Sequence, residues 1–300
     1  MAHTDTVFPD TTPFEPVVKD GRIHCPAVGD DTTNLAQMLF AIRYLIKTGK
    51  RPKGNVLFVA NSCEEGLGNL KGSRKVMEDF GHRVAEFTTF DGSYTTYVDH
   101  SVGSRRYEVT ITTEGGHSYG AFGNRNAIHY MASLIDTLYT LKVPKEGKST
   151  YNVGIIEGGT SVNTIAQQCK MLFEYRSDRR ENLASMDAFF HKTIEAYRAM
   201  GIGVTVELVG DRPCMGDVDP AMEQKLRDRV IKAIKDHTGN VVTGTSGSTD
   251  CNIPHSMGVP AICFGGYLGA GAHTREEYIE MESLKTGMPI ILQYVLDDFN

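Results

Sequence analysis

The chain has 300 residues, of which 40% are hydrophobic and 23% are charged, as in a globular protein of one large or two ordinary domains. Its net charge of −6 and its lack of basic clusters argue against nucleic acid as a partner. No apolar run reaches the ~18–20 residues of a membrane span, and residues 1–10 lack the features of a secretory signal. The six cysteines form no Cys-x-x-Cys pair, which favours reduced thiols in a cytoplasmic protein.

Helices and strands alternate in the first part of the chain. Hydrophobic periodicity predicts a helix over residues 30–47 and another over residues 69–80. The apolar, β-branched run 55–60 predicts a buried strand, and residues 85–92 predict the next one. This order is typical of an α/β domain with a largely parallel sheet.

The pattern changes after residue 102. Alternating and helical segments follow in the order strand, helix, strand, strand, helix, strand, at residues 105–115, 126–141, 149–159, 169–178, 181–201 and 203–211. That order is ferredoxin-like. The α/β pattern then resumes with a helix that starts after Asp219 with Pro220 and stops at Gly239, followed by strand 260–266 and helix 283–299. We therefore predict that residues 103–211 form an inserted domain and that residues 1–102 and 212–300 form one α/β domain.

Ionisable residues stand close to the ends of the predicted strands and at one helix start. They are His3, Asp5, Asp30, Glu64, Glu65, Asp91 and His273. In α/β sheets, ligands bind beyond the carboxyl ends of the strands. Imidazole and carboxylate without thiolate fit zinc in a catalytic site, with cobalt or manganese as alternatives. The positive charge of a metal would offset the repulsion between the adjacent carboxylates of Glu64 and Glu65. One of them would bind the metal and the other would act as a base.

Each of these features also has an ordinary explanation. A Glu-Glu pair on a loop is usually solvated, and Asp30–Asp31 before a helix complements the helix dipole. Cys63 is more often a small buried residue than a nucleophile. All candidate ligands nevertheless fall in the two α/β segments and none in the inserted block, which favours one shared site.

Short motifs around these residues resemble the co-catalytic zinc metallopeptidases that include peptidase T, carboxypeptidase G and aminoacylase. The motifs of the α/β segments are AHTDTVFPD, VGDDTTNLA, SCEEG, FDG and GAGAHTREEY. In the inserted block, EGGHSYGAFGNRNAI and GGTSVNTIA with FEYRS resemble the dimerisation domain of the same family. The resemblance covers almost the whole chain and keeps the motif order.

The resemblance implies a role for each residue. His3 and Asp91 would hold one zinc, Glu65 and His273 the other, and Asp30 would bridge the two. Asp5 would orient His3, and Glu64 would be the general base on the bridging water. The resemblance also implies a cis peptide bond between Asp30 and Asp31.

The resemblance further implies functional residues around the substrate. His117 would reach across a dimer to stabilise the oxyanion in the partner's site, although a histidine after Gly-Gly can also be a turn residue. Asn163 and Arg176 match the polar signature, and a guanidinium suits a substrate carboxylate; the alternative for Arg176 is an ion pair with a neighbour such as Asp178. Gly269 and Gly271 would let backbone amides approach the substrate.

Two departures from the family pattern stand out. Family members usually carry several tens of residues before the His-x-Asp motif, whereas His3 is the third residue here. The chain is therefore either incomplete at its N-terminus or from a branch without that layer. Thr32 also stands where many relatives have lysine.

The prediction is thus a zinc-peptidase catalytic domain of α/β class with a mostly parallel sheet, interrupted by a ferredoxin-like α+β dimerisation (lid) domain. The expected enzyme is a dinuclear zinc hydrolase that acts on small peptides and forms a homodimer through the inserted domain. Asp91, in place of glutamate, resembles the aminopeptidase-like members more than the carboxypeptidase-like ones, which favours a di- or tripeptidase. The alternatives are an aminoacylase or carboxypeptidase-type amidohydrolase on N-acyl amino acids, a metal-free dimeric binding protein, and a thiol hydrolase using Cys63.

Overall fold

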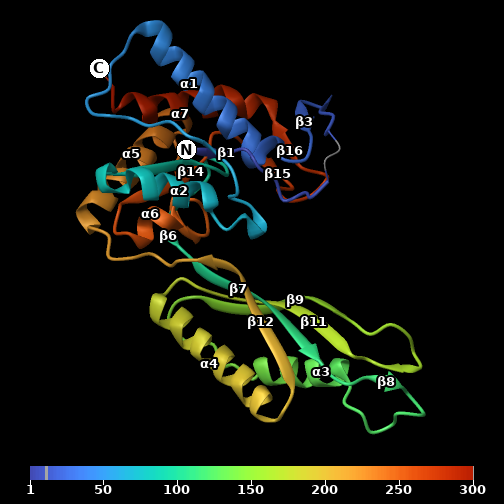
Figure 1. Ribbon diagram of the computed structural model, residues 1–300. Coiled ribbons are helices and arrows are strands. Elements are labelled where there is room, and N and C mark those ends of the chain that lie inside the picture. The colour runs from blue at the N-terminus through green and yellow to red at the C-terminus, as the bar shows by residue number, and fades with distance from the viewer. Residues whose placement is uncertain (11–12, 300) are drawn as a thin grey trace. The chain divides into compact units, whose positions relative to one another are not determined.

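The computed structural model describes residues 1–10 and 13–299, which form two compact units (Figure 1). Unit 1 contains residues 1–101 and 215–300, and unit 2 contains residues 102–214. In the described part of the chain, no helix combines the length and the apolar character needed to cross a membrane.

Unit 1 contains a short parallel pair, a mixed sheet and an antiparallel sheet. The parallel pair is β1 (Ala2–His3) with β4 (Ala60–Asn61). The mixed sheet has the order β13 (Gly244–Gly247), β6 (Tyr97–Ser101), β14 (Ala261–Phe264) and β5 (Phe87–Phe90), and only its β14–β6 pair is antiparallel. The antiparallel sheet has the order β15 (Gly269–Ala270), β16 (Tyr278–Glu280), β3 (Arg22–His24) and β2 (Val17–Lys19).

The predicted mostly parallel sheet is therefore wrong in part, since the strands of unit 1 are not all parallel. Sequential strands joined by short connections, such as β2–β3 and β15–β16, can pair only antiparallel, because parallel strands need a long crossover connection. One such connection is Asp20–Gly21 between β2 and β3, where both residues have positive φ.

Five helices surround these strands in the described part of unit 1. They are α1 (Asn34–Thr48), α2 (Lys71–Phe80), α5 (Pro220–Thr238), α6 (Asn252–Ser256) and α7 (Leu284–Leu296). The helix start predicted at Asp219 is confirmed, because its Oδ1 accepts a hydrogen bond from the Ala221 N–H at 2.8 Å. Apolar residues of α1, α5 and α7, with Ile262 and Phe264 of β14, form one buried cluster.

The strand predicted over residues 55–60 is wrong except at its end. Only Ala60 and Asn61 form a strand, and Val56 and Leu57 are 40% and 54% exposed. A strand needs a partner for its backbone groups. Among the described residues, the segment 55–59 has only the hydrogen bond from the Ala2 N–H to the Val59 carbonyl as a link to β1.

Unit 2 has the predicted strand–helix–strand–strand–helix–strand order. Its elements are β7 (Gly103–Thr112), α3 (Ala127–Leu138), β9 (Ser149–Gly158), β11 (Gln168–Ser177), α4 (Arg180–Ala199) and β12 (Gly203–Arg212). The four strands form an antiparallel sheet in the order β12–β7–β11–β9. A separate two-stranded pair joins β8 (Gly116–His117) to β10 (Thr164–Ile165).

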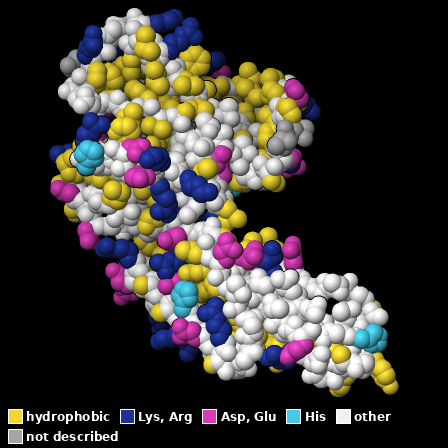
Figure 2. Space-filling view, in the orientation of Figure 1, with side chains coloured by type: hydrophobic (Ala, Val, Ile, Leu, Met, Phe, Trp, Pro, Cys, Tyr) yellow, Lys and Arg dark blue, Asp and Glu magenta, His cyan; other side chains and the backbone are white. Residues whose placement is uncertain are grey.

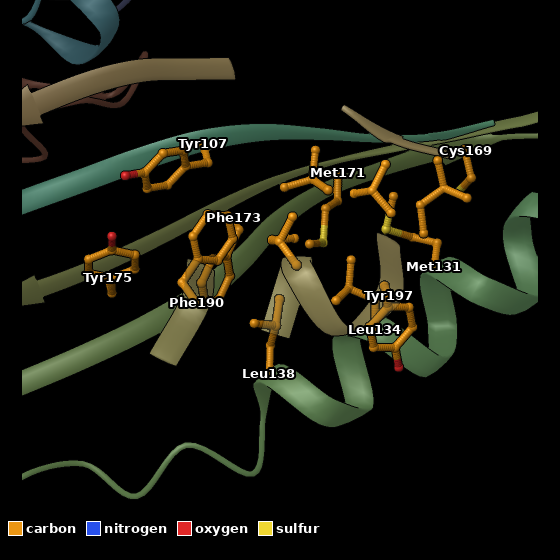
Figure 3. Packing of buried hydrophobic residues seen from close by; sticks show 14 of the residues in the cluster. Tyr107, Met131, Leu134, Leu138, Cys169, Met171, Phe173, Tyr175, Phe190 and Tyr197 are labelled. Carbon is orange, nitrogen blue, oxygen red and sulfur yellow. The ribbon is translucent and has the colours of Figure 1, made fainter. Parts of the chain in front are cut away.

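The core of unit 2 lies between the sheet and its two helices (Figure 3). Phe190 of α4 is 1% exposed, and its ring centroid lies 4.4 Å from that of Tyr107 and 5.7 Å from that of Phe173. From α3, the buried residues Met131, Leu134 and Leu138 face the same core. The two helices therefore bury their apolar stripes within the unit.

We expect Phe190→Ala to lower the free energy of unfolding by about 3–5 kcal/mol, because it removes a fully buried ring and leaves a cavity. Urea denaturation followed by far-UV circular dichroism measures the change, since the chain has no tryptophan. The matched control is Met200→Ala, which removes an apolar side chain that is 61% exposed just after α4. Equal shifts of the two variants would contradict the central place of Phe190.

Candidate metal centre

The carboxylate of Asp30 lies between two histidines from opposite ends of the chain. Its Oδ1 is 3.0 Å from Nε2 of His3, and its Oδ2 is 3.1 Å from Nε2 of His273. Asp30 belongs to the turn Val28–Thr33, which precedes α1. The Asp30–Asp31 peptide bond is cis, as predicted. One carboxylate thus faces both imidazoles, with one oxygen for each.

Further carboxylates surround this pair. Glu65 Oε1 is 3.2 Å from Nε2 of His273. Ligand atoms of His3, Glu64 and Glu65 lie within 4.8 Å of one another, and so do those of His3, Asp31 and Asp91. The structure therefore brings together all five residues predicted as metal ligands, with Glu64 beside them.

The strands of unit 1 explain this convergence. His3 ends β1 and pairs in register with Asn61 at the end of β4, so that the Glu64–Glu65 pair follows three residues later. Asp91 comes directly after β5. The parallel strands β1 and β4 end at the same side, which places His3 close to the glutamates.

Asp31 belongs to the cluster by distance but has other partners. Its Oδ2 accepts a hydrogen bond from the His3 backbone N–H at 2.9 Å, and its Oδ1 accepts one from Asn34 Nδ2 at 2.8 Å. It is 2% exposed. Both of its oxygens therefore already accept hydrogen bonds, one from the backbone of β1 and one from a side chain of α1.

Asp5 links His3 to the glutamate pair. Its carboxylate accepts hydrogen bonds from the backbone N–H groups of Glu64 and Glu65, at 3.2 and 2.9 Å. His3 Nδ1 lies 3.1 Å from the Asp5 carbonyl oxygen and 3.6 Å from the Asp5 carboxylate. A proton on Nδ1 leaves Nε2 with its lone pair toward Asp30. The contact to the glutamate backbone is one that the sequence did not predict.

The cluster strongly favours positive charge at its histidines. Burial alone would lower the pKa of His3, but hydrogen bonds with Asp30 and Asp5 raise it well above its ordinary value. Asp30 and Glu65 raise the pKa of His273 to about 10. Burial, together with the charge of Asp30, raises the pKa of Asp91 to about 7. Excess negative charge is thus concentrated here, and a divalent cation would offset it.

The donor set fits zinc. Among the described residues, the ion pairs of Asp30 and Glu65 are with histidines only, so that no lysine or arginine neutralises them there. Imidazole nitrogens and carboxylate oxygens without a thiolate match the ligands of catalytic zinc sites. His3, Asp30, Glu65, Asp91 and His273 are the residues that would hold the metal.

Two further predicted residues lie side by side in unit 2. His117 pairs with Thr164 across the β8–β10 ladder, and the Ser118 N–H donates to the Asn163 carbonyl at 2.9 Å. The exposed imidazole of His117 accepts hydrogen bonds at Nδ1 from the backbone N–H groups of Tyr119 and Gly120, at 3.3 and 3.2 Å. The neutral tautomer that fits these bonds carries its proton on Nε2, which makes no hydrogen bond with the described residues.

Arg176 on β11 has a different partner from the one considered from sequence. It donates to both oxygens of Glu174 at 3.1 Å, so the ion pair suggested with Asp178 is replaced by one with Glu174. Arg176 is also partly exposed, at 36% of its side chain. A role in binding a substrate carboxylate stays a prediction.

Backbone geometry accounts for the two glycines near His273. A Cβ at Gly269 would lie 2.2 Å from the Tyr278 carbonyl oxygen, and Gly271 has φ +80°. Their predicted contact with substrate is therefore not needed to explain them, and it stays a prediction. Thr32 is exposed, and nothing in the structure explains the departure from lysine.

A cluster of imidazoles and carboxylates of this kind is what a metallohydrolase uses. Residues 1–297 match peptidase family M20/M25/M40, and the chain belongs to this family. The protein is therefore a hydrolase of amide bonds. Enzymes of the family are generally metal-dependent, typically with zinc.

Individual relatives are distant. A succinyl-diaminopimelate desuccinylase of Nitrosomonas europaea is 27% identical over 269 residues, which are 83% of this chain and 69% of the relative. Among solved structures, a tripeptidase from Staphylococcus aureus has a TM-score of 0.74 at 23% identity and covers 98% of this chain and 78% of its own. The Saccharomyces cerevisiae di-peptidase Dug1p has a TM-score of 0.71 at 16% identity, with coverage of 95% and 75%. At these identities the solved structures establish a shared fold.

Proposed function

We propose that this protein is a dinuclear zinc peptidase that cleaves di- or tripeptides, with a preference for a free amino terminus. One observation carries the proposal: the two oxygens of Asp30 each face the Nε2 of a different histidine, at 3.0 and 3.1 Å. A carboxylate in that position suits a bridge between two ions. His3 and Asp91 would hold one ion, and His273 and Glu65 the other.

Glu64 is the proposed general base. Bound zinc would supply Lewis acidity, lowering the pKa of water and polarising the scissile carbonyl. Glu64 would take a proton from the attacking water and deliver it to the leaving amine. Asp5 holds this residue in place through the Glu64 N–H, and the 6% exposure of Glu64 limits competition from bulk solvent.

We also propose that unit 2 forms a homodimer and supplies His117 to the partner's site. Its Nε2–H would stabilise negative charge on the substrate carbonyl oxygen. Large apolar side chains are exposed around it. Tyr119 and Phe122, which follow it in sequence, are 90% exposed, and Val162, next to Asn163, is 102% exposed. Figure 2 displays hydrophobic side chains at the β8 end of this unit, and such patches favour association.

The sheet of unit 2 limits where a second copy could pair. β7 has partners on both sides, and α3 buries its stripe in the core of unit 2. The free edges are β9 and β12. β9 exposes Ile155 and Ile156 at about half of their area, which supports β9 as the dimer edge.

Activity on N-acyl amino acids is the second candidate. The first matching relatives are named succinyl-diaminopimelate desuccinylase, and that name describes removal of an N-acyl group. The same metal ligands and the same general base would serve the hydrolysis of either kind of amide.

We also propose that the protein is located in the cytoplasm, because all six cysteines are free thiols.

We expect the purified protein to contain about two zinc ions per chain and to lose its activity on removal of metal by a chelator. Re-addition of zinc, cobalt or manganese should restore activity, because the donor set accepts all three. The measurement is metal analysis with a panel of free-amino dipeptides, free-amino tripeptides, and N-acetyl and N-succinyl amino acids.

Each outcome of this panel has a defined meaning. Faster cleavage of the free-amino peptides supports the peptidase, and faster cleavage of the N-acyl amino acids supports the second candidate. Metal content near zero after exposure to zinc would contradict both and favour a metal-free binding protein. Activity that resists the chelator but is blocked by a thiol reagent would instead implicate Cys63.

A further inference from the structure

Glu277 is a buried carboxylate close to the candidate metal centre. None of the roles proposed above is assigned to it. It lies immediately before β16, four residues after His273, and it is 2% exposed. Among the described residues it forms no salt bridge with lysine, arginine or histidine. A carboxylate in such a place needs hydrogen-bond donors to compensate for its lost hydration.

The donors are backbone N–H groups of the turn that carries Asp30. Oε2 of Glu277 accepts from the Ala27 N–H at 2.6 Å, and Oε1 accepts from the Gly29 and Asp30 N–H groups at 2.8 and 2.9 Å. The Glu277 backbone carbonyl accepts from the Cys25 N–H at 3.0 Å. One residue therefore holds the backbone on both sides of Val28.

These bonds connect two proposed metal ligands that are far apart in sequence. Asp30 is fixed through its own N–H, and its carboxylate faces His3 and His273. Glu277 also belongs to the segment that carries His273. Antiparallel pairing of Tyr278 with His24 holds this segment against β3. The distance between Asp30 and His273 thus depends on a contact from one loop to the other.

We propose that Glu277 is a positioning residue, which holds the Asp30 turn so that the Asp30 carboxylate stands between His3 and His273. This inference rests on the proposed dinuclear site. Only a carboxylate offers acceptors on both oxygens. A glutamine would place an N–H₂ group against one set of backbone N–H groups. An aspartate keeps the charge but is one methylene shorter than the three bonds require.

The test compares Glu277→Gln with Glu276→Gln, which removes the same charge one residue away. Glu276 is exposed and contacts neither Asp30 nor the proposed ligands in the hydrogen bonds of the described residues. Zinc affinity is measured by competition with a chromophoric chelator, and the geometry by the absorption spectrum of the cobalt-loaded protein. We expect Glu277→Gln to bind zinc about 10–100-fold more weakly and to change the cobalt spectrum, because supporting contacts of ligands have effects of this size. Glu276→Gln should match the wild type in both.

Wild-type zinc affinity and an unchanged cobalt spectrum in Glu277→Gln would overturn the inference and leave the dinuclear site intact. Equal loss in both variants would overturn it in favour of a general charge effect. A wild-type protein that binds no zinc would overturn the proposed function together with the inference. Should Glu277→Gln fail to fold, Glu277→Asp provides the same comparison. It should fold and lose affinity, and wild-type affinity in that variant would count against positioning.

Discussion

Glu64→Gln should abolish turnover while leaving the metal content unchanged. The glutamine keeps the size of the side chain but cannot accept a proton, and removal of a general base lowers the rate by about 10²–10⁴-fold or more. The backbone bond from the Glu64 N–H to Asp5 does not involve the side chain and should persist in the variant. Steady-state kinetics on the preferred peptide and metal analysis of the same sample measure the two effects.

Glu65→Ala is the comparison variant that distinguishes a metal ligand from a general base. Glu65 Oε1 lies 3.2 Å from Nε2 of His273, and we propose that both hold the same ion. The variant should therefore lose metal as well as activity. The distances are also compatible with Glu64 as a metal ligand, since its carboxylate lies with His3 and Glu65 in one group of close ligand atoms. Equal metal loss in the two variants would show that Glu64 is a ligand and not the base.

Strong local signals made the long elements predictable. Asp219, Pro220 and Gly239 mark both ends of α5, and the structure contains the cap that they predict. The strand expected over residues 55–60 failed because an apolar run alone establishes neither a partner strand nor burial, and Val56 and Leu57 are 40% and 54% exposed. The sheet of β2, β3, β15 and β16 went unpredicted because its strands are two or three residues long. Its one readable signal is Asp20–Gly21, a dipeptide typical of tight hairpin turns.

Some residues of the candidate site could likewise be predicted from the sequence, and others could not. His3, Asp30, Glu65 and His273 could be selected because histidines and carboxylates are usual zinc ligands and stand here in motifs of a recognisable order, and the structure brings them together. Glu277 could not be selected, since its partners are backbone N–H groups, which every residue possesses. Its only signal is an acidic residue close after His273, beside an exposed Glu276 that looks the same in sequence.

Inactive His117→Ala chains should regain activity when mixed with inactive Glu64→Gln chains. In a heterodimer, one site combines an intact Glu64 with an intact His117 from the partner, whereas the other site lacks both. By the two-fold symmetry of such a dimer, activity should recover to at most about half of the wild-type value per heterodimer. The free Nε2–H of His117 is the group whose loss explains the inactivity of the first variant.

The controls separate this exchange of residues from an effect on stability or dimer formation. His129→Ala alters another exposed histidine of unit 2, in α3, and should keep full activity and the same oligomeric state. Each inactive variant mixed with itself should remain inactive. Subunit exchange is verified with chains of different mass, and metal analysis verifies that both variants are loaded. Recovery under these conditions requires that His117 acts in the partner's site, since neither chain carries a complete set of its own. No recovery, with exchange and loading both verified, would mean that His117 acts within its own chain or has no part in catalysis.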